Sequence, residues 1–298
     1  MRVVVTGGSG FIGRHVVARL SARGDEVSVV DLRPFGGEGV PLVVGDLRDR
    51  PVVDEAVGAG VDAVVHLAAI TSVLQSVNEP DAVFRTNVVA TEHLLERCRD
   101  LGVGRLVFAS TNAVVGDVGR AIIDESLALH PLTPYGATKA AAEMLLSAYA
   151  SSYGITAVAL RFTNVYGAGM QVKDSVVARL MRAALSGGGI QVYGDGEQLR
   201  DYVHVTDAAA AIEHGLALDA ADTLTIGAGR SVSMNELHAI ACKATGVDIG
   251  KEHVPAKPGE MPAVVVSNAK ARASGWTPAH SLEEGIAATW QDFRGTGG

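Results

Sequence analysis

A glycine-rich segment near the N-terminus, Thr6-Gly7-Gly8-Ser9-Gly10-Phe11-Ile12-Gly13, constrains the fold more than any other part of the chain. It lies between an apolar run, Arg2–Val5, and a segment with helical spacing, Ile12–Arg23. Glycines let a backbone turn tightly from a strand into a helix and approach an anion at the helix N-terminus, where amide groups and the dipole favour negative charge. The segment therefore predicts a turn that binds the diphosphate of a dinucleotide, with contacts from Gly7, Gly10, Phe11, Ile12 and Gly13.

An acidic residue, Asp31, follows the next apolar run, Val27–Val30, and lies 18 residues after Gly13. A carboxylate at this distance can accept both ribose hydroxyls of an adenosine and would repel a 2′-phosphate. Asp31 therefore favours NAD as the cofactor. Arg33, two residues further on, could pair with a 2′-phosphate, so NADP stays open.

Short apolar runs alternate with helical patterns through the first half of the chain. Continuously apolar runs are typical of parallel strands that are buried on both faces. We expect strands at Arg2–Val5, Val27–Val30, Leu42–Val44, Ala63–Leu67, Leu106–Ala109 and Val158–Arg161, and helices at Ile12–Arg23, Val52–Gly58, Val83–Leu101 and Gly136–Tyr153. This order predicts an α/β fold with a Rossmann-type, doubly wound parallel sheet over residues 1–168. Residues 169–298 are predicted to form a smaller α+β lobe that binds substrate, with residues 207–226 returning to the first domain.

Composition narrows the class of protein. The 298 residues are 48% hydrophobic and 19% charged, with a net charge of −8. This balance argues against nucleic acid or an anionic membrane as the main partner, because both select positive surfaces. No run approaches the ~20 apolar residues that span a bilayer. The two cysteines, Cys98 and Cys242, indicate neither a disulfide framework nor a cysteine metal cluster. We expect a cytoplasmic protein with no metal site.

Three further residues lie where predicted strands end. Asp46 and Leu47 follow Leu42–Val44, where they could border the adenine; an ordinary strand-end turn explains the spacing equally well. His66 ends another strand at the same edge, and we expect a buried histidine with a structural role.

A tyrosine and a lysine are spaced for chemistry at the start of the helix Gly136–Tyr153. Tyr135 and Lys139 are four residues apart, which places both side chains on one helical face. A tyrosine must have its pKa lowered from ~10 to act as a base near neutrality. A nearby ammonium and a positively charged nicotinamide ring would both favour the phenolate. The pair therefore predicts a catalytic base and its supporting cation.

The combined motifs resemble those of the extended short-chain dehydrogenase/reductases, in the NAD-dependent epimerase/dehydratase family. They are most similar to the nucleotide-sugar 4-epimerases, the UDP-galactose (UDP-glucose) 4-epimerase group. The motifs are Thr6–Gly13, Asp31, Asp46-Leu47, Asn87, Ser110-Thr111, Tyr135-x-x-x-Lys139 and Arg161–Gly167, and the resemblance continues to Gly275–Pro278 and Ser281–Gly285. It implies NAD as cofactor, a homodimer paired through two helices, and further cofactor contacts from Leu67, Ala68, Ala69, Asn87 and Ser110.

The resemblance also implies a mechanism. Tyr135 would take the proton from the sugar O4 hydroxyl while C4 loses a hydride, and the 4-keto sugar would take the hydride back on its other face. Thr111 would bond the reacting oxygen, and Lys139 would hold the nicotinamide ribose. Related 4,6-dehydratases carry an Asp–Glu pair after the threonine; Asn112 and Ala113 stand there in this chain and disfavour dehydration. Val115 replaces a tyrosine that is usual in the family.

The same resemblance assigns residues to the nucleotide-diphosphate sugar. Arg200 and Asn164 would bind the diphosphate, Tyr193 would lie against the base, and Val264 would set the room at the sugar C2 substituent, admitting N-acetylated sugars. The family motif Arg-Pro-Gly-Asp appears as Lys257-Pro258-Gly259-Glu260. This change leaves the base open between uridine, which we favour, and thymidine.

Two other functions stay open. A 4-ketoreductase would use the same Tyr135, Lys139 and Thr111 but release its cofactor in each turnover, and Arg33 is its support in the sequence. A non-catalytic dinucleotide-binding regulator is disfavoured, because such a protein would not need the Tyr135–Lys139 pair.

Overall fold

The computed structural model describes residues 1–256 and 261–295. Their contacts divide the chain into two compact units. Unit 1 comprises Met1–Gly116, Glu125–Phe162 and Ala209–Leu224, and unit 2 comprises Asp117–Asp124, Thr163–Ala208 and the described part of Thr225–Gly298. Within the described ranges, no helix is long and apolar enough to cross a membrane.

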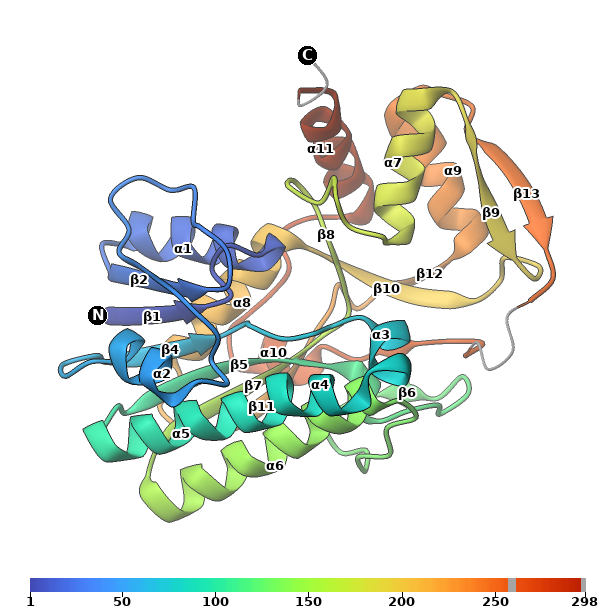
Figure 1. The fold of residues 1–298 in the computed structure, drawn as a ribbon. Coiled ribbons are helices and arrows are strands. Elements are labelled where there is room, and N and C mark those ends of the chain that lie inside the picture. Colours follow the sequence, from blue (N-terminus) through green and yellow to red (C-terminus); the bar gives the residue numbers. More distant parts are fainter. Residues whose placement is uncertain (257–260, 296–298) are drawn as a thin grey trace. The chain divides into compact units, whose positions relative to one another are not determined.

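A seven-stranded sheet organises unit 1 (Figure 1). Its strands are β1 (Arg2–Thr6), β2 (Glu26–Asp31), β3 (Leu42–Val44), β4 (Ala63–His66), β5 (Arg105–Thr111), β7 (Thr156–Phe162) and β11 (Asp222–Ile226). They lie in the order β11-β7-β5-β4-β1-β2-β3, and the six strands from β7 to β3 pair in parallel. The chain leaves β1 toward β2 and later returns on its other side with β4. This reversal confirms the predicted doubly wound fold, and such a reversal opens a binding crevice at the carboxyl ends of the strands.

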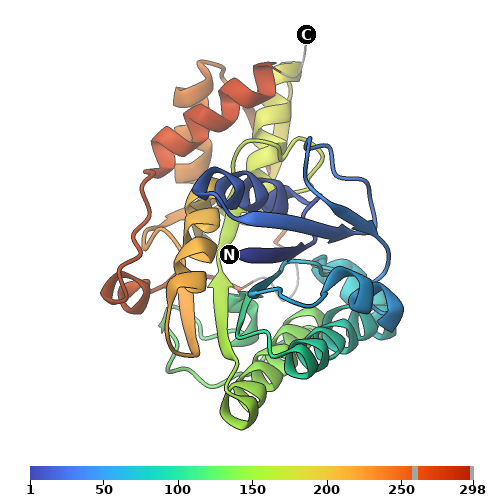
Figure 2. The ribbon, with the colours of Figure 1, turned by 90° about the vertical axis from the view of Figure 1, so that its left-hand side faces the viewer.

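Helices cover both faces of this sheet. They are α1 (Phe11–Arg23), α2 (Arg50–Ala56), α3 (Val73–Asn78), α4 (Pro80–Phe84), a π-turn η1 (Arg85–Val89), α5 (Ala90–Leu101), a 3-10 turn η2 (Asn112–Val114), α6 (Pro134–Tyr153) and α8 (Val205–Ala217). Figures 1 and 2 show α5 and α6 on one face and α1 on the other. The helix expected over Val83–Leu101 is interrupted, because the π-turn widens the backbone at Arg85–Val89.

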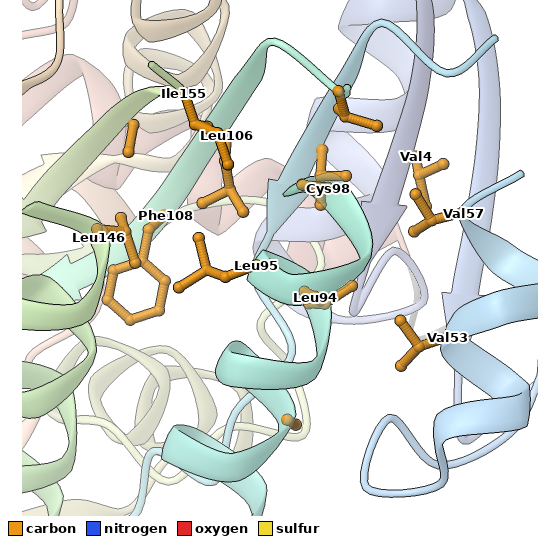
Figure 3. Packing of buried hydrophobic residues seen from close by; sticks show 14 of the residues in the cluster. Val4, Val53, Val57, Leu94, Leu95, Cys98, Leu106, Phe108, Leu146 and Ile155 are labelled. Carbon is orange, nitrogen blue, oxygen red and sulfur yellow. The ribbon is translucent and has the colours of Figure 1, made fainter. Parts of the chain in front are cut away.

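The core of unit 1 follows the period-2 pattern of its strands. Leu106 and Phe108 of β5 point into the apolar cluster beneath α5 and α6, where Leu95 and Leu146 lie beside them (Figure 3). Val107 points to the opposite face, where an added Cβ at Gly215 of α8 would lie 3.3 Å from its methyl groups. Burial on both faces explains why these strands are almost continuously apolar.

Unit 2 is smaller and mixes short sheets with helices. Its strands are β6 (Ile122–Ile123), β8 (Asn164–Tyr166), β9 (Gly189–Tyr193), β10 (Leu199–His204), β12 (Ser231–Ser233), β13 (Gly250–Val254) and β14 (Val265–Val266), and its helices are α7 (Val176–Ser186), α9 (Met234–Thr245), α10 (Ala269–Ala273) and α11 (Leu282–Gly295). The central sheet has the order β12-β10-β8, while β13 pairs with β9 and β14 with β6. The α+β character expected for the second lobe is observed.

Candidate active site

The glycine-rich turn joins β1 to α1. Gly7 has a φ of +70°, and its amide donates to the Val30 carbonyl at 2.9 Å. A Cβ on Gly13 would lie 2.2 Å from the Gly7 carbonyl oxygen, so only glycine lets α1 start this close to the turn. No side chain caps α1 at Gly10 and no acidic residue lies in its first turn. The positive end of the helix dipole is therefore not neutralised by the chain, as a diphosphate site requires.

Asp31 is the last residue of β2 and lies beside this turn. Its two carboxylate oxygens accept hydrogen bonds from the backbone amides of Ser9 and Arg33, each at 3.0 Å. The Arg33 guanidinium reaches the Ser9 carbonyl at 3.5 Å, with two-thirds of its side chain exposed. A carboxylate oxygen can accept more than one hydrogen bond. Asp31 is thus held in place with capacity left for ribose hydroxyls.

The loop after β4 packs directly on the turn. The Thr6 hydroxyl accepts hydrogen bonds from the amides of Leu67, at 3.2 Å, and Ala68, at 3.1 Å. An added Cβ at Gly7 would lie 2.7 Å from the Ala68 nitrogen. The segment Leu67–Ala69 therefore borders the glycine turn at the sheet's reversal point, and its contacts with NAD stay predictions.

His66 has the structural role that its position predicted. Its Nδ1 bonds the Thr6 hydroxyl at 2.7 Å and its Nε2 bonds the Thr91 hydroxyl at 3.0 Å. Burial, followed by the charge of Lys139, lowers the pKa of His66 to about 3. The ring is therefore neutral near pH 7.

Two other predicted cofactor residues are engaged by the chain itself. Asp46 accepts hydrogen bonds from the backbone and guanidinium of Arg48, and these bonds lower the pKa of its carboxyl group. This arrangement is an Asx-type turn at the strand end, with Leu47 buried beside it. The Asn87 amide exchanges two hydrogen bonds with the backbone of Ile70 and also donates to the Thr138 hydroxyl. Asn87 thus ties the loop after β4 to α6, and contacts of Asp46, Leu47 and Asn87 with NAD stay predictions.

Tyr135 lies in the first turn of α6. Thr133 caps this helix by accepting from the Gly136 amide at 3.2 Å, and Pro134 occupies its first position. A Cβ on Gly136 would lie 2.7 Å from the Ala113 carbonyl, so the helix start packs closely on the segment after β5. This approach brings the Tyr135 phenol into hydrogen-bond contact with the Thr111 hydroxyl at the end of β5.

Lys139 lies one helical turn further along α6 and is 2% exposed. Its ammonium donates to the Ala109 carbonyl at 2.8 Å and lies 4.4 Å from the centre of the Phe108 ring. Burial lowers the pKa of Lys139 to about 7, while the charge of Glu143 acts in the opposite direction. Burial raises the pKa of Tyr135 to about 12, and the Thr111 hydrogen bond lowers it. The phenol therefore needs positive charge beside it to ionise near neutrality.

Ser110 is the predicted cofactor residue on β5. It is bonded to a buried Glu143–Arg161 ion pair, to which the sequence analysis assigned no role. Its hydroxyl donates to the Glu143 carboxylate, which also forms a buried ion pair with Arg161 at 2.7 Å. Glu143 is eight residues after Tyr135 and is an acid in an otherwise apolar helical stretch. That spacing was a usable signal.

Asn112 and Ala113 form the short turn η2 after Thr111, and the Ala113 amide donates to the Thr111 hydroxyl at 3.2 Å. Neither position carries a carboxylate.

Four of the residues predicted to bind substrate, Arg200, Asn164, Tyr193 and Val264, lie in unit 2 around β10, whereas Thr111 ends β5 in unit 1. Arg200 donates to the carbonyls of Leu199 at 2.7 Å and Met261 at 2.9 Å. The Asn164 amide donates to the Asp201 carbonyl, and Val264 pairs with Leu199 through its own amide. Tyr193 is linked to the start of β10 by Gln198, the residue before this strand, whose side-chain amide donates to the Tyr193 carbonyl. Lys257 lies outside the described residues.

Sequence reasoning also missed Asp201, a fully buried acid in β10. Its carboxylate accepts hydrogen bonds from the Thr163 hydroxyl and from the amides of Ala228, Gly229 and Arg230, at 2.8 to 3.1 Å. Burial raises the pKa of Asp201 in spite of these bonds. The acid holds the loop after β11 against the strand that carries Arg200.

Fold and site together define a dinucleotide-binding enzyme of the tyrosine–lysine type, built on a Rossmann sheet. Residues 3–227 match the NAD dependent epimerase/dehydratase family, and the chain belongs to that family. Membership confirms both the family resemblance and NAD as the predicted cofactor. Gly7, Gly13 and Asp31 fit this group, because the turn leaves no space for side chains and the acid is held beside it.

Solved structures and curated relatives include more than one activity. UDP-glucose 4-epimerase from Thermus thermophilus, in complex with NAD, superposes with a TM-score of 0.91 at 38% identity over 99% of both chains. The Thermotoga maritima UDP-glucose 4-epimerase with UDP-glucose superposes with a TM-score of 0.92 at 33% identity, again over 99% of both chains. A dTDP-glucose 4,6-dehydratase from Streptomyces niveus is 32% identical over 99% of this chain and 93% of its own.

Proposed function

We propose that this protein catalyses the NAD-dependent epimerisation of a nucleotide-diphosphate sugar at C4, with a UDP-hexose as substrate. The observation that carries the proposal is the contact between the Tyr135 phenol and the Thr111 hydroxyl, one helical turn from the buried Lys139 ammonium. Such a pair of hydroxyls can bind a single sugar oxygen and move its proton.

When bound, NAD would supply the hydride chemistry at C4. The chain would hold it through Gly7, Gly10, Phe11, Ile12 and Gly13 at the diphosphate and through Asp31 at the adenosine ribose. The protein's own groups handle the proton. Tyr135 accepts it from the O4 hydroxyl and later returns it to the same oxygen, Thr111 orients that oxygen, and Lys139 favours the phenolate and bonds the nicotinamide ribose.

The 4-keto sugar must present its other face before it is reduced again. The protein must therefore hold the sugar loosely and the nucleotide firmly. We assign the firm contacts to Arg200, Asn164, Tyr193 and Lys257 of unit 2, with the planar Arg200 guanidinium suited to a diphosphate. Val264, a small side chain, would leave room for an N-acetyl group.

Epimerisation is favoured over dehydration because of η2. Removal of water between C5 and C6 needs an acid and a base beyond Tyr135, and Asn112 and Ala113 supply neither. A 4-ketoreductase is the second candidate, favoured by the exposed Arg33 guanidinium beside Asp31, which could accept the 2′-phosphate of NADP.

We also propose a cytoplasmic homodimer. Met144 and Tyr153 of α6 are apolar and 66% and 52% exposed, which suits a helix that pairs with a second copy. Cys98 and Cys242 are both free thiols, as expected in a reducing compartment.

The decisive experiment is incubation with UDP-glucose, UDP-glucuronate, UDP-N-acetylglucosamine and dTDP-glucose in trace NAD, followed by chromatography. Conversion of one sugar to a mixture with its C4 epimer, without accumulation of NADH, supports the proposal and names the substrate. If the enzyme converts UDP-glucose but does not convert UDP-N-acetylglucosamine, the role given to Val264 is contradicted. Product that requires stoichiometric reduced cofactor would instead support the ketoreductase.

A further inference from the structure

A buried polar network links β5, α6 and β7 behind the tyrosine–lysine pair. Glu143 is 7% exposed, and its carboxylate accepts from the Ser110 hydroxyl and from Arg161 Nε at 3.0 Å and Nη2 at 2.7 Å. Ser110 and Arg161 are 4% and 5% exposed. A buried ion pair is expensive to desolvate and is often no better for stability than apolar packing. The buried Glu143–Arg161 ion pair therefore indicates a role other than stability.

Helix geometry aligns this acid with the catalytic pair. Tyr135, Lys139 and Glu143 follow one another at intervals of four residues, and each step of four rotates by only ~40° from a full turn. The three side chains therefore form one stripe of α6, with Lys139 in the middle. Glu143 lies on the side of Lys139 that faces away from Tyr135, so it can act on the phenol only through the lysine.

Few other charges act on the Lys139 ammonium. Its direct partners are the Ala109 carbonyl and the Phe108 ring, neither of which carries a net charge. His66 on β4 is neutral, as shown above. Among the described groups, Glu143 is the one acid whose charge opposes the effect of burial on the lysine.

The other described elements packed against α6 offer no acid that could replace Glu143 in acting on Lys139. On η1, Asn87 meets Thr138 through uncharged groups. On α5, Glu96 bonds the Tyr149 hydroxyl, ten residues beyond Lys139. On α4, Asp81 pairs with Arg85 at the surface. On β7, the Arg161 guanidinium is directed at Glu143 itself. Without Glu143, nothing described would counter the desolvation of the ammonium.

We propose that Glu143 is a positioning residue for catalysis: its carboxylate, fixed by Ser110 and Arg161, keeps the Lys139 ammonium charged and aligned behind Tyr135. The inference rests on the proposed function for its kinetic consequence. The Ser110 and Arg161 bonds point the carboxylate toward the interior, where its field on the lysine is screened little by water.

The consequence is a change in the pH dependence of turnover. Tyr135 must be ionised and Lys139 protonated for the first proton transfer. When Glu143 is neutral, Lys139 loses its proton at lower pH, and Tyr135 then lacks the cation that favours the phenolate. The alkaline limb of the kcat profile shifts to lower pH while KM stays nearly constant, because the buried Glu143 carboxylate is bonded to Ser110 and Arg161 and is assigned no contact with substrate or cofactor.

The test uses the NAD-loaded enzyme and the variant Glu143→Gln, which leaves an oxygen to accept from Ser110. We expect the alkaline limb of the pH profile of kcat to shift to lower pH by about one unit, and kcat at pH 8 to fall about tenfold. The matched control is Glu213→Gln on α8, which removes a carboxylate paired with Arg19 and should leave the profile unchanged. Loss of turnover at every pH with an unshifted limb would overturn the proposal.

Two further measurements keep the test independent of folding and of the substrate. Because Glu143→Gln leaves the buried Arg161 charge without its partner, the double variant with Arg161→Met removes both charges. It should still shift the alkaline limb to lower pH, but by less than Glu143→Gln alone, because no uncompensated cation remains near Lys139. NMR titration of 13C-labelled lysine, with Lys139 assigned through Lys139→Arg, follows the ammonium without turnover. A lower midpoint in the variants supports the inference even if the sugar panel contradicts epimerisation, and an unchanged midpoint overturns it.

Discussion

The Lys139 ammonium donates to the Ala109 carbonyl at 2.8 Å, and so fixes α6 to the end of β5. Thr111 lies two residues beyond Ala109 on this strand, and Tyr135 lies one helical turn before Lys139. This hydrogen bond, together with the close approach of Gly136 to the Ala113 carbonyl, sets the register in which the phenol meets the threonine hydroxyl. The proposed catalytic contact between Tyr135 and Thr111 therefore depends on a strand and a helix that are separate in the sequence.

Removal of the phenolic oxygen should abolish the proton transfer. We expect Tyr135→Phe to lower kcat by about 10²- to 10⁴-fold, the usual contribution of a general base, while NAD binding and the melting temperature stay close to those of the wild type. Steady-state kinetics and calorimetry measure both. Tyr153→Phe, an exposed tyrosine on the same helix, is the control and should keep full activity. Equal losses in the two variants would contradict the assignment.

Stability should respond to Lys139 in a pH-dependent way. Burial lowers the pKa of Lys139 to about 7, below its unfolded value of ~10.4. The unfolded chain therefore binds more protons between these values, and stability from this group rises with pH across that window. We expect Lys139→Met to have a higher free energy of unfolding than the wild type at pH 7. Urea titrations should show the difference shrinking toward pH 10, and a constant difference would exclude this origin.

The glycine turn should tolerate no side chain at Gly13, its last glycine. In Gly13→Ala, the new Cβ would lie 2.2 Å from the Gly7 carbonyl, so the turn or the helix start must move. We expect NAD affinity, measured by calorimetric titration, to fall at least tenfold. Gly104→Ala is the control, because its Cβ would meet nothing within 4 Å. Similar NAD affinity in the two variants would rule out this packing argument.

Cofactor choice should depend on the charge of Asp31. The carboxylate can accept ribose hydroxyls and repels a 2′-phosphate. We expect Asp31→Asn to weaken NAD about tenfold and to raise the affinity for NADP relative to NAD by a similar factor, helped by Arg33. Binding titrations with both dinucleotides decide this. Adding Arg33→Ala should remove the gain for NADP, and an unchanged ratio in Asp31→Asn would contradict the role of the acid.

Several features followed from the sequence alone because they depend on local spacing. The glycine turn, Asp31 at the end of β2, and the Tyr135–Lys139 interval are each set by a few consecutive residues. Apolar runs predicted the buried strands of unit 1 because a parallel sheet covered on both faces needs them. The chain's membership in the NAD dependent epimerase/dehydratase family could be read from the same motifs.

Tertiary structure decided which side chains meet. Glu143, Ser110 and Arg161 are far apart in sequence and come together only because β5, β7 and α6 pack against one another. The π-turn that presents Asn87 to Ile70, and the β10 strand that gathers Arg200, Asn164 and Val264, could not be predicted for the same reason. Local patterns fix the elements and the class of cofactor, whereas pKa values and hydrogen-bond partners depend on burial among distant residues, which a sequence does not display.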